Sequence, residues 1–396
     1  MRSPRLSTRL AAWGLAAAVL TLVGAADAAP YVPDSDDVVI ERLPEQAEPS
    51  LKELKRLRAI LARDPRNLDV AAVVARRSIE AARALGDPRF LGQAQAALAP
   101  WWISADPASA ALLLRATLKQ SQHDFAGALG DLDRLLAREG ANGQALLTRA
   151  TVLTVRGRYA DAEIDCRRLA QRTTALVVAA CAAAPVSLSG RAEAAYRTLL
   201  QALDRGGDPP AIRAWALTLA AEIAARRGDL YSADAHFRAA FALDSRDAYL
   251  RAAYADFLLD SDRARDALPL VRDETRNDAL LLRLALAERT LPDMRSAFDA
   301  HRADLAARFD AARARGDTLH QREEARFALS IQGDAQKALA LARDNWKVQR
   351  EPADLRILAE AALATKDAVA LETVDRWIDD MRIEDATLAA LRGARR

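Results

Sequence analysis

The sequence predicts an all-α protein built from repeated helical hairpins, and three observations support this prediction. Hydrophobic residues make up 51% of the 396 residues and aromatic residues only 5%, so the apolar content is mainly alanine and leucine, which favour helices. Stretches that alternate Val, Ile or Tyr with polar residues, as strands do, are scarce. A cluster of glycine, an aromatic residue and alanine returns along the chain, for example in "RGRYADAEIDC" at residues 156–166.

The first 28 residues have the three parts of a secretory signal. Arg2, Arg5 and Arg9 make the start basic, the apolar run "AAWGLAAAVLTLVGAA" follows, and "ADA" at residues 26–28 has the small-x-small form of a cleavage site. We therefore predict a signal peptide over residues 1–28. An uncleaved membrane anchor is the alternative, but the proline-rich polar segment that follows favours cleavage.

Charge and hydropathy then limit the partners and the location. Removing residues 1–28 reduces Lys and Arg from 57 to 54 and Asp and Glu from 55 to 54, so the mature chain is formally neutral. A neutral, evenly mixed chain lacks the basic face that nucleic acid usually requires, so we expect no nucleic-acid partner. No later stretch has the roughly 20 apolar residues of a transmembrane helix, so we expect no stable membrane anchor after cleavage. The predicted location is secreted, and periplasmic if the source is a bacterium.

The next two segments differ in composition. Residues 29–49 contain several prolines and many acidic residues, which predicts an extended arm rather than a helix. From Ser50 onward, apolar residues recur at helical spacing on one stripe, as in "SLKELKRLRAILARD". Residues 50–108 are therefore predicted to form degenerate helical hairpins that cap the N-terminal end.

A repeat of about 34 residues organises the middle of the chain, a length that is typical of two-helix units. The segment "LLLRATLKQSQHDFAGAL" (112–129) aligns with "LLTRATVLTVRGRYADAE" (146–163), and every matched position has the same offset. Residues 217–234 align with residues 251–268 at that offset too. The loop "RGGDPP" (205–210) can hold the three extra residues between the two pairs. A fixed period of this length predicts stacked two-helix units, each of which needs its neighbours to cover its apolar face.

These repeats resemble the tetratricopeptide (TPR) family. In residues 143–176, Ala150 and Ala162 stand at the small positions, Gly157 at the turn and Tyr159 at the aromatic position; residues 214–247 are similar, with Ala221, Gly228, Ala233, Phe237 and Ala240. His123 and Asp262 replace the turn glycine in two units, and the usual Trp and terminal Pro are missing. The resemblance implies a right-handed α-solenoid, with about five repeats in residues 109–275 and degenerate TPR-like helices and a cap in residues 276–396.

The resemblance also implies a concave binding face lined by the first helix of each hairpin. Carried over by position, that face comprises Thr117, Gln120, Thr151, Thr154, Glu222 and Asp256, with Ala180 and Ala184 in the middle. The Lys, Arg and Asn with which some TPR proteins clamp a terminal carboxylate are absent from these positions. A small polar face that becomes acidic suits an extended backbone or a basic peptide better than an acidic tail. The sequence favours equally the alternative that these residues are ordinary solvated positions with no binding role.

Signals of catalysis, metal binding or cofactor binding are weak. The four histidines have no HExxH spacing, no Cys/His cluster suggests zinc, and no phosphate loop or nucleophile motif occurs. Asp131 and Asp133 form an acidic pair in sequence, but a helix places them on different faces. We therefore predict no enzyme, no catalytic residue, no metal and no cofactor. Arg115 and Arg149 recur with the period at a packing position, which predicts structural ion pairs.

Two features leave alternatives open. Cys166 and Cys181 are the only cysteines, and a secreted location would permit a disulfide; two small buried core residues are the other interpretation. Trp101 and Trp102 in "APWW" form either an aromatic plug beside the N-terminal helices or an interaction site.

The functional prediction is a non-catalytic scaffold or adaptor that mediates protein–protein interaction in the bacterial periplasm, with an unidentified protein or peptide as partner. The alternative is an assembly or structural component of an envelope export machine, with polysaccharide or an outer-membrane channel as partner, so a glycan is the second choice. A narrow groove would favour a peptide, and a wide basic or aromatic groove would favour a glycan.

Overall fold

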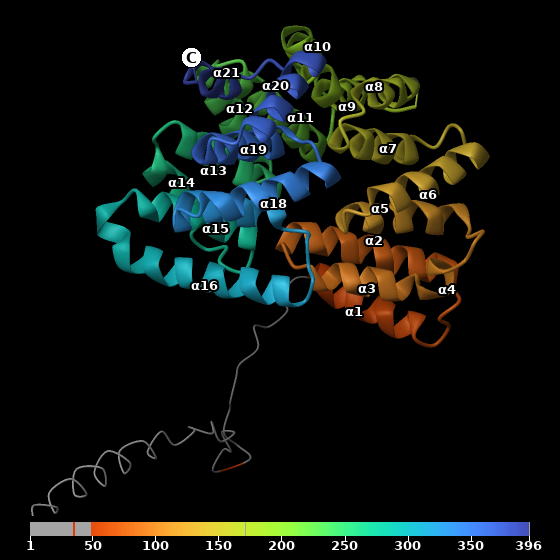
Figure 1. Ribbon diagram of the computed structural model, residues 1–396. Helices are drawn as coiled ribbons and strands as arrows, with labels where there is room; N and C mark the ends of the chain where they lie inside the picture. The colour runs from red at the N-terminus through yellow and green to blue at the C-terminus, as the bar shows by residue number, and fades with distance from the viewer. Residues whose placement is uncertain (1–34, 36–48, 171, 396) are drawn as a thin grey trace, which may run out of the picture. The chain divides into compact units, whose positions relative to one another are not determined.

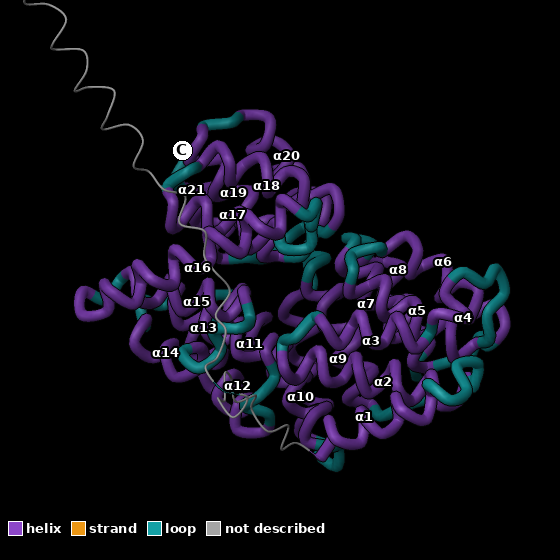
Figure 2. The backbone as a smooth tube through the Cα atoms, turned by 90° about the horizontal axis from the view of Figure 1, so that it is seen from below, coloured by secondary structure: helices purple, strands orange, loops and turns teal. Residues whose placement is uncertain are grey.

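The computed structural model describes residue 35, residues 49–170 and residues 172–395. The predicted signal peptide and all of the predicted arm except Ser35 and Pro49 lie outside the described residues. Contacts divide the chain into two units, Met1–Pro49 and Ser50–Arg396, and the first helix of the second unit begins at Pro49. The described residues of this unit form helices and no strand, as Figure 1 and Figure 2 show, which confirms the predicted all-α class.

The helices are short and regular. They are α1 (Pro49–Leu61), α2 (Leu68–Leu85), α3 (Arg89–Ala97), α4 (Ala99–Trp102), α5 (Ser109–Ser121), α6 (Phe125–Arg138), α7 (Gly143–Val155), α8 (Tyr159–Arg168), α9 (Ala175–Ser187), α10 (Ala192–Asp204), α11 (Pro210–Arg226), α12 (Leu230–Leu243), α13 (Ala248–Asp260), α14 (Ala264–Val271), α15 (Asp278–Arg289), α16 (Arg295–Ala314), α17 (Gln321–Phe327), α18 (Ala335–Val348), α19 (Pro352–Thr365), α20 (Ala368–Met381) and α21 (Ala386–Gly393). A 3-10 turn, η1 (Pro292–Met294), precedes α16, and a π-helical turn, η2 (Ala328–Gln332), continues α17.

Consecutive helices pair as hairpins, and the hairpins stack. From α5 to α20, each odd-numbered helix packs against the even-numbered helix that follows it. Each odd-numbered helix also contacts the odd-numbered helix of the next hairpin, from α5 with α7 through to α17 with α19. The unit is therefore an α-solenoid of TPR-like hairpins in which the first helices form one continuous inner layer. Five of these hairpins lie between Ser109 and Val271.

The sequence cluster that marks each hairpin has a structural counterpart. The turn residue adopts a left-handed backbone conformation, with φ of 74° at Gly157 and 80° at Gly228. His123 and Asp262 adopt the same conformation at the equivalent turns, with φ of 57° and 56°. The small residues that follow, such as Ala162, are fully buried where the helices cross.

Buried ion pairs repeat with the hairpins. The Arg115 guanidinium donates two hydrogen bonds to Asp131, at 2.7 and 2.6 Å, and Arg149 donates two to Asp165, both at 2.7 Å. Each pair joins the first and second helix of one hairpin, and the two pairs lie one repeat apart along the chain. The predicted structural role of Arg115 and Arg149 is confirmed. Asp133 instead pairs with Arg149 at 2.6 Å, so the two aspartates of "DLD" face different partners.

The C-terminal hairpins return to the middle of the solenoid. The backbone N–H of Arg350 donates to the carbonyl of Val155 at 2.7 Å, although the two residues are far apart in sequence. The Arg350 guanidinium lies 4.8 Å from the Trp377 ring centre, and Trp377 lies against the turn at Gly157. Figure 1 shows these blue helices beside the yellow and green helices of the central hairpins. The later hairpins thus cover part of the inner layer, whereas the resemblance led us to expect an open groove.

Candidate functional site

The inner layer of first helices surrounds a cavity of about 750 Å³, which we call the central cavity. Its wall comes from α7, α9, α11 and α13, and it is closed by residues of α2, α15, α17 and α19. The volume lies within the roughly 300–1,000 Å³ usual for ligand sites. Of the residues predicted for the concave face, Thr151, Thr154, Ala180, Ala184, Glu222 and Asp256 line the cavity. Thr117 and Gln120 on α5 are not part of the lining.

Helix α11 contributes one long stripe to the wall. Trp215, Leu219, Glu222 and Arg226 recur every three or four residues, so they lie on one face of the helix and all line the cavity. Eleven residues of helix rise by roughly 16 Å, so this stripe runs from an aromatic end to a basic end along the cavity. Hydrophobic periodicity alone could not distinguish the residues of this stripe from the residues of α11 that face the core, because α11 is apolar on nearly every side.

Asp256 on α13 is fully engaged by arginines. One carboxylate oxygen accepts a hydrogen bond from Arg283 on α15 at 2.7 Å, and the other accepts from Arg326 on α17 at 2.6 Å. Burial alone would raise the pKa of Asp256, but the two guanidinium groups lower it well below its usual range. Asp256 is therefore ionised, and its charge is neutralised within the protein.

Glu222 differs from Asp256 because no arginine pairs with it among the described residues. Its Oε1 atom accepts a hydrogen bond from the Tyr249 hydroxyl at 2.6 Å, and among the described residues it forms no ion pair. Burial raises the pKa of Glu222, although Tyr249 and the nearby Arg226 oppose this effect. The charge of Glu222 in turn raises the pKa of Tyr249 well above its usual value, so Tyr249 stays protonated and donates.

The remaining charges of the lining fall into two groups. Arg322 on α17 pairs with Glu351 at 2.8 Å and with Glu323 at 3.3 Å, so these three charges largely satisfy one another. Arg226 donates to the Ser187 hydroxyl at 3.0 Å, and Arg83 is exposed at the edge of the cavity. Within the described part of the chain, neither Arg83 nor Arg226 pairs with a carboxylate.

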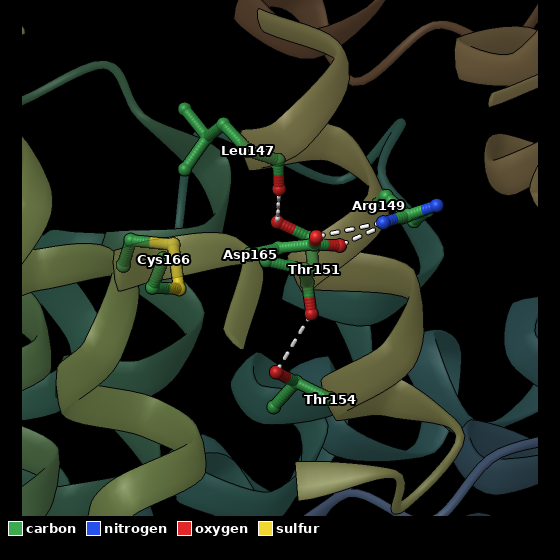
Figure 3. The surroundings of a disulfide bond; sticks show 8 residues. Leu147, Arg149, Thr151, Thr154, Asp165 and Cys166 are labelled. Atoms are coloured by element: carbon green, nitrogen blue, oxygen red, sulfur yellow. Dashed lines mark hydrogen bonds and ion pairs between the residues drawn. A yellow bond between two sulfur atoms is a disulfide. The ribbon is translucent and has the colours of Figure 1, made fainter. Parts of the chain in front are cut away.

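A disulfide lies beside the wall of the cavity. The structure joins Cys166 on α8 to Cys181 on α9, with 5.5 Å between the Cα atoms, and Cys181 belongs to the cavity lining. Figure 3 shows this bond together with Thr151 and Thr154 on α7. The hydroxyls of Thr151 and Thr154 donate to helix carbonyls, at 3.0 and 2.8 Å, so towards a ligand these oxygens act as acceptors.

The tryptophan pair of "APWW" lies outside the cavity. Trp101 and Trp102 pack against the apolar cluster of the N-terminal helices. Their carbonyls accept hydrogen bonds from Arg115 at 3.1 and 2.8 Å, which fixes α4 to the first repeat. These contacts favour the plug over the interaction site.

Three of the four histidines also have structural partners. His301 lies 2.9 Å from the buried Glu288 carboxylate, His236 contacts the Tyr196 hydroxyl at 2.7 Å, and His123 stacks on Phe125. In the part of the chain that the structure describes, no group of three or more His, Cys, Asp or Glu residues could hold a metal ion. No described helix is both long and apolar enough to cross a membrane.

A second cavity of about 550 Å³ lies between the end of α11 and the helices α20 and α21. Most of its charges have partners: Arg227 pairs with Glu193, Arg392 pairs with Asp379 at 2.7 Å, and Arg226 and Glu384 have neutral hydrogen-bond partners. The Asp385 carboxylate accepts from the backbone of Leu388 as the cap of α21. The central cavity is therefore the better candidate for a binding site.

Comparisons with known proteins give no family for the chain. No protein-family model matches it, and no curated protein matches it. Among solved structures, a tetratricopeptide repeat protein from Parabacteroides merdae is 14% identical with a TM-score of 0.37, covering 74% of this chain and 98% of that one.

Two other solved structures are similar at the same level. A monomeric IFIT1 mutant with Gppp-AAAA is 12% identical, with a TM-score of 0.42 over 87% of this chain and 85% of that one. The P58(IPK) TPR domain is 16% identical, with a TM-score of 0.23 over 77% and 98%. The ligands of these proteins do not transfer to this chain at such scores, and its TPR-like character rests on its own hairpins.

Proposed function

We propose that this chain is a non-catalytic scaffold that holds an extended segment of a partner protein in its central cavity, in the periplasm of a bacterium. The observation that carries the proposal is the half-enclosed cavity on the first helices, which Thr151 and Thr154 line from α7 and Glu222 lines from α11. The hydroxyl oxygens of Thr151 and Thr154, which remain free to accept, suit the N–H groups of a peptide backbone.

The lining supports a peptide rather than a glycan. Small and aliphatic residues such as Ala180, Ala184 and Leu219 form much of the wall, and its aromatic members are Trp215 and Tyr249. The lining is mixed in charge and is neither mainly basic nor mainly aromatic. A role in an envelope export machine with a polysaccharide partner is therefore the less favoured candidate.

The proposed location has two supports. Residues 1–28 have the pattern of a secretory signal, and the Cys166–Cys181 bond suits an oxidising compartment. Measuring the mass of the mature protein from the native envelope would test cleavage after Ala28.

Site-specific photo-crosslinking in native cells would test the proposed partner. A photoreactive amino acid placed at Thr151 faces the cavity, whereas one placed at Ile164, which is 47% exposed on α8, is outside the cavity lining. We expect one dominant crosslinked protein from position 151 and not from position 164. Crosslinks only to polysaccharide would support the export-machine candidate, and equal crosslinking at both positions would contradict a cavity site.

Matched substitutions would complete this test. Thr151→Arg fills the cavity with a long cation and should abolish the crosslink formed through a probe at Thr154. Thr373 on α20 makes the same bond to its own helix, from its hydroxyl to the Val369 carbonyl at 2.9 Å, but does not line the cavity. Thr373→Arg should therefore leave the crosslink unchanged.

A further inference from the structure

The acidic residues of the central cavity are satisfied within the protein with one exception. Arg283 and Arg326 both pair with Asp256, and Arg322 pairs with Glu323 and with Glu351. The Asp247 carboxylate accepts from the backbone N–H of Leu250 as the cap of α13. Glu222 remains, with the neutral Tyr249 hydroxyl as its hydrogen-bond partner and no ion pair within the described residues.

The geometry leaves part of this carboxylate free for a ligand. Tyr249 occupies Oε1 of Glu222, and no hydrogen bond or ion pair to Oε2 is formed by the described part of the chain. Tyr249 is 60% exposed, so solvent reaches the pair through the mouth of the cavity. A carboxylate in this half-enclosed position loses hydration and gains only the longer-range attraction of Arg226, so a cation from outside would supply its direct ion pair.

The neighbouring wall suits the stem of a long basic side chain. Leu219 lies one turn before Glu222 on the same face of α11, and Ala252 and Ala253 line the cavity from α13, on the same helix as Tyr249. These apolar residues can pack against methylene groups while the charged end reaches the carboxylate, which is how Lys and Arg side chains commonly bury their stems. Arg226 is held by Ser187 at the wall shared with the second cavity.

We propose that Glu222, oriented by Tyr249, binds the cationic side chain of a lysine or arginine in the peptide segment that occupies the central cavity. This inference rests on the proposed function and adds a specificity to it. A charge-assisted hydrogen bond in a partly desolvated site contributes enough free energy that replacing the basic residue by a neutral one should weaken binding roughly tenfold or more.

The test uses the mature protein, immobilised, and a library of hexapeptides blocked at both termini. Retained peptides are sequenced by mass spectrometry, and the affinities of the enriched peptides are then measured by fluorescence anisotropy. For the unaltered protein we expect enrichment of Lys or Arg at one position. For Glu222→Gln, which keeps the shape and the bond to Tyr249, we expect that enrichment to disappear while peptides are still retained.

A charge reversal keeps the inference falsifiable if the glutamine variant folds poorly. Glu222→Arg should shift the enrichment at the same position to Asp or Glu, and circular dichroism would confirm that each variant is folded. Retention of no peptide by the unaltered protein would overturn the proposed function itself. Retention of peptides with no basic preference, or an unchanged preference in both variants, would overturn the assignment of Glu222 and leave the scaffold intact.

Discussion

At each hairpin turn, one residue carries the backbone through a left-handed conformation. Gly157 and Gly228 do this without a side chain, whereas His123 and Asp262 do it with one, each a single repeat away from one of those glycines. A residue with a Cβ atom loses about 1–2 kcal/mol in this conformation, somewhat less for aspartate. The alignment of repeats predicted which residues occupy the turns, and therefore also where this strain lies.

Replacing Asp262 by glycine should stabilise the protein. The Asp262 side chain is exposed and forms no hydrogen bond or ion pair within the described residues, so only the strain is removed. The greater freedom of glycine in the unfolded chain offsets part of the gain, and we expect the free energy of unfolding to rise by about 0.5 kcal/mol. Urea denaturation followed by circular dichroism would measure it.

The control for this prediction is Asp262→Ala. It removes the same charge but keeps a Cβ atom, so it should give no such gain. If alanine and glycine stabilised the protein equally, loss of the charge rather than relief of strain would be the cause.

At the scale of the helical hairpin, local sequence predicted the structure well. The period aligned Arg115 with Arg149, and the structure gives each a buried aspartate on the second helix of its own hairpin. Such contacts are close in sequence, so a short repeated pattern is enough to specify them. The aspartates themselves were not singled out as partners, because their burial depends on packing that a helical period does not fix.

Removing the carboxylate of Asp131 should destabilise the first hairpin strongly. Arg115 and Lys119 both lie within 3 Å of this fully buried group, and each would lose its counter-charge in Asp131→Asn. Loss of one partner of a buried pair typically costs about 3–5 kcal/mol. Asp133→Asn, two residues away and 63% exposed, leaves Arg149 paired with Asp165 and should cost less than about 1 kcal/mol.

The pH dependence of this effect follows from the pKa of Asp131. Burial alone would raise that pKa, but hydrogen bonds from Arg115 and Lys119 lower it below its ordinary value. A lowered folded-state pKa means that the carboxylate stabilises the protein above about pH 4, the ordinary aspartate pKa, and that this contribution is lost as pH falls further. The difference in unfolding free energy between the unaltered protein and Asp131→Asn should therefore shrink on acidification below pH 4, and a constant difference would contradict the ion pair.

At the scale of the whole Ser50–Arg396 unit, the sequence predicted less. The face of each first helix is a local property, and Thr151, Thr154, Glu222 and Asp256 all line the central cavity. How far the later hairpins cover that surface depends on the small rotation between each hairpin and the next, summed over many hairpins, and no single sequence motif predicts this sum. For this reason the exclusion of Thr117 and Gln120 from the cavity and the neutralisation of Asp256 by Arg326, 70 residues away, were not predictable.

The closure can be tested at the turn where the C-terminal hairpins meet the middle of the chain. A Cβ atom at Gly157 would lie 2.6 Å from the Trp377 ring, whereas one at Gly228, also left-handed, would lie 3.7 Å from its nearest neighbour, Ala386. Gly157→Ala and Gly228→Ala should both lose about 1–2 kcal/mol through backbone strain. Gly157→Ala should lose about 1–3 kcal/mol more, because the Trp377 side chain must move away.

Hydrogen exchange would show whether the extra loss of stability in Gly157→Ala comes from disrupting the contact between the C-terminal hairpins and the middle of the chain. The Arg350 N–H donates to the Val155 carbonyl at 2.7 Å, across the junction between the two parts of the solenoid. Its protection against exchange should fall in Gly157→Ala and stay unchanged in Gly228→Ala, where the added Cβ atom makes an ordinary contact with Ala386 and displaces nothing. If both variants lost equal stability and kept the Arg350 amide protected, the contact at Gly157 would not hold the C-terminal hairpins in place. The ion pairs Asp256–Arg326 and Asp260–Arg356 would then have to hold these hairpins over the central cavity.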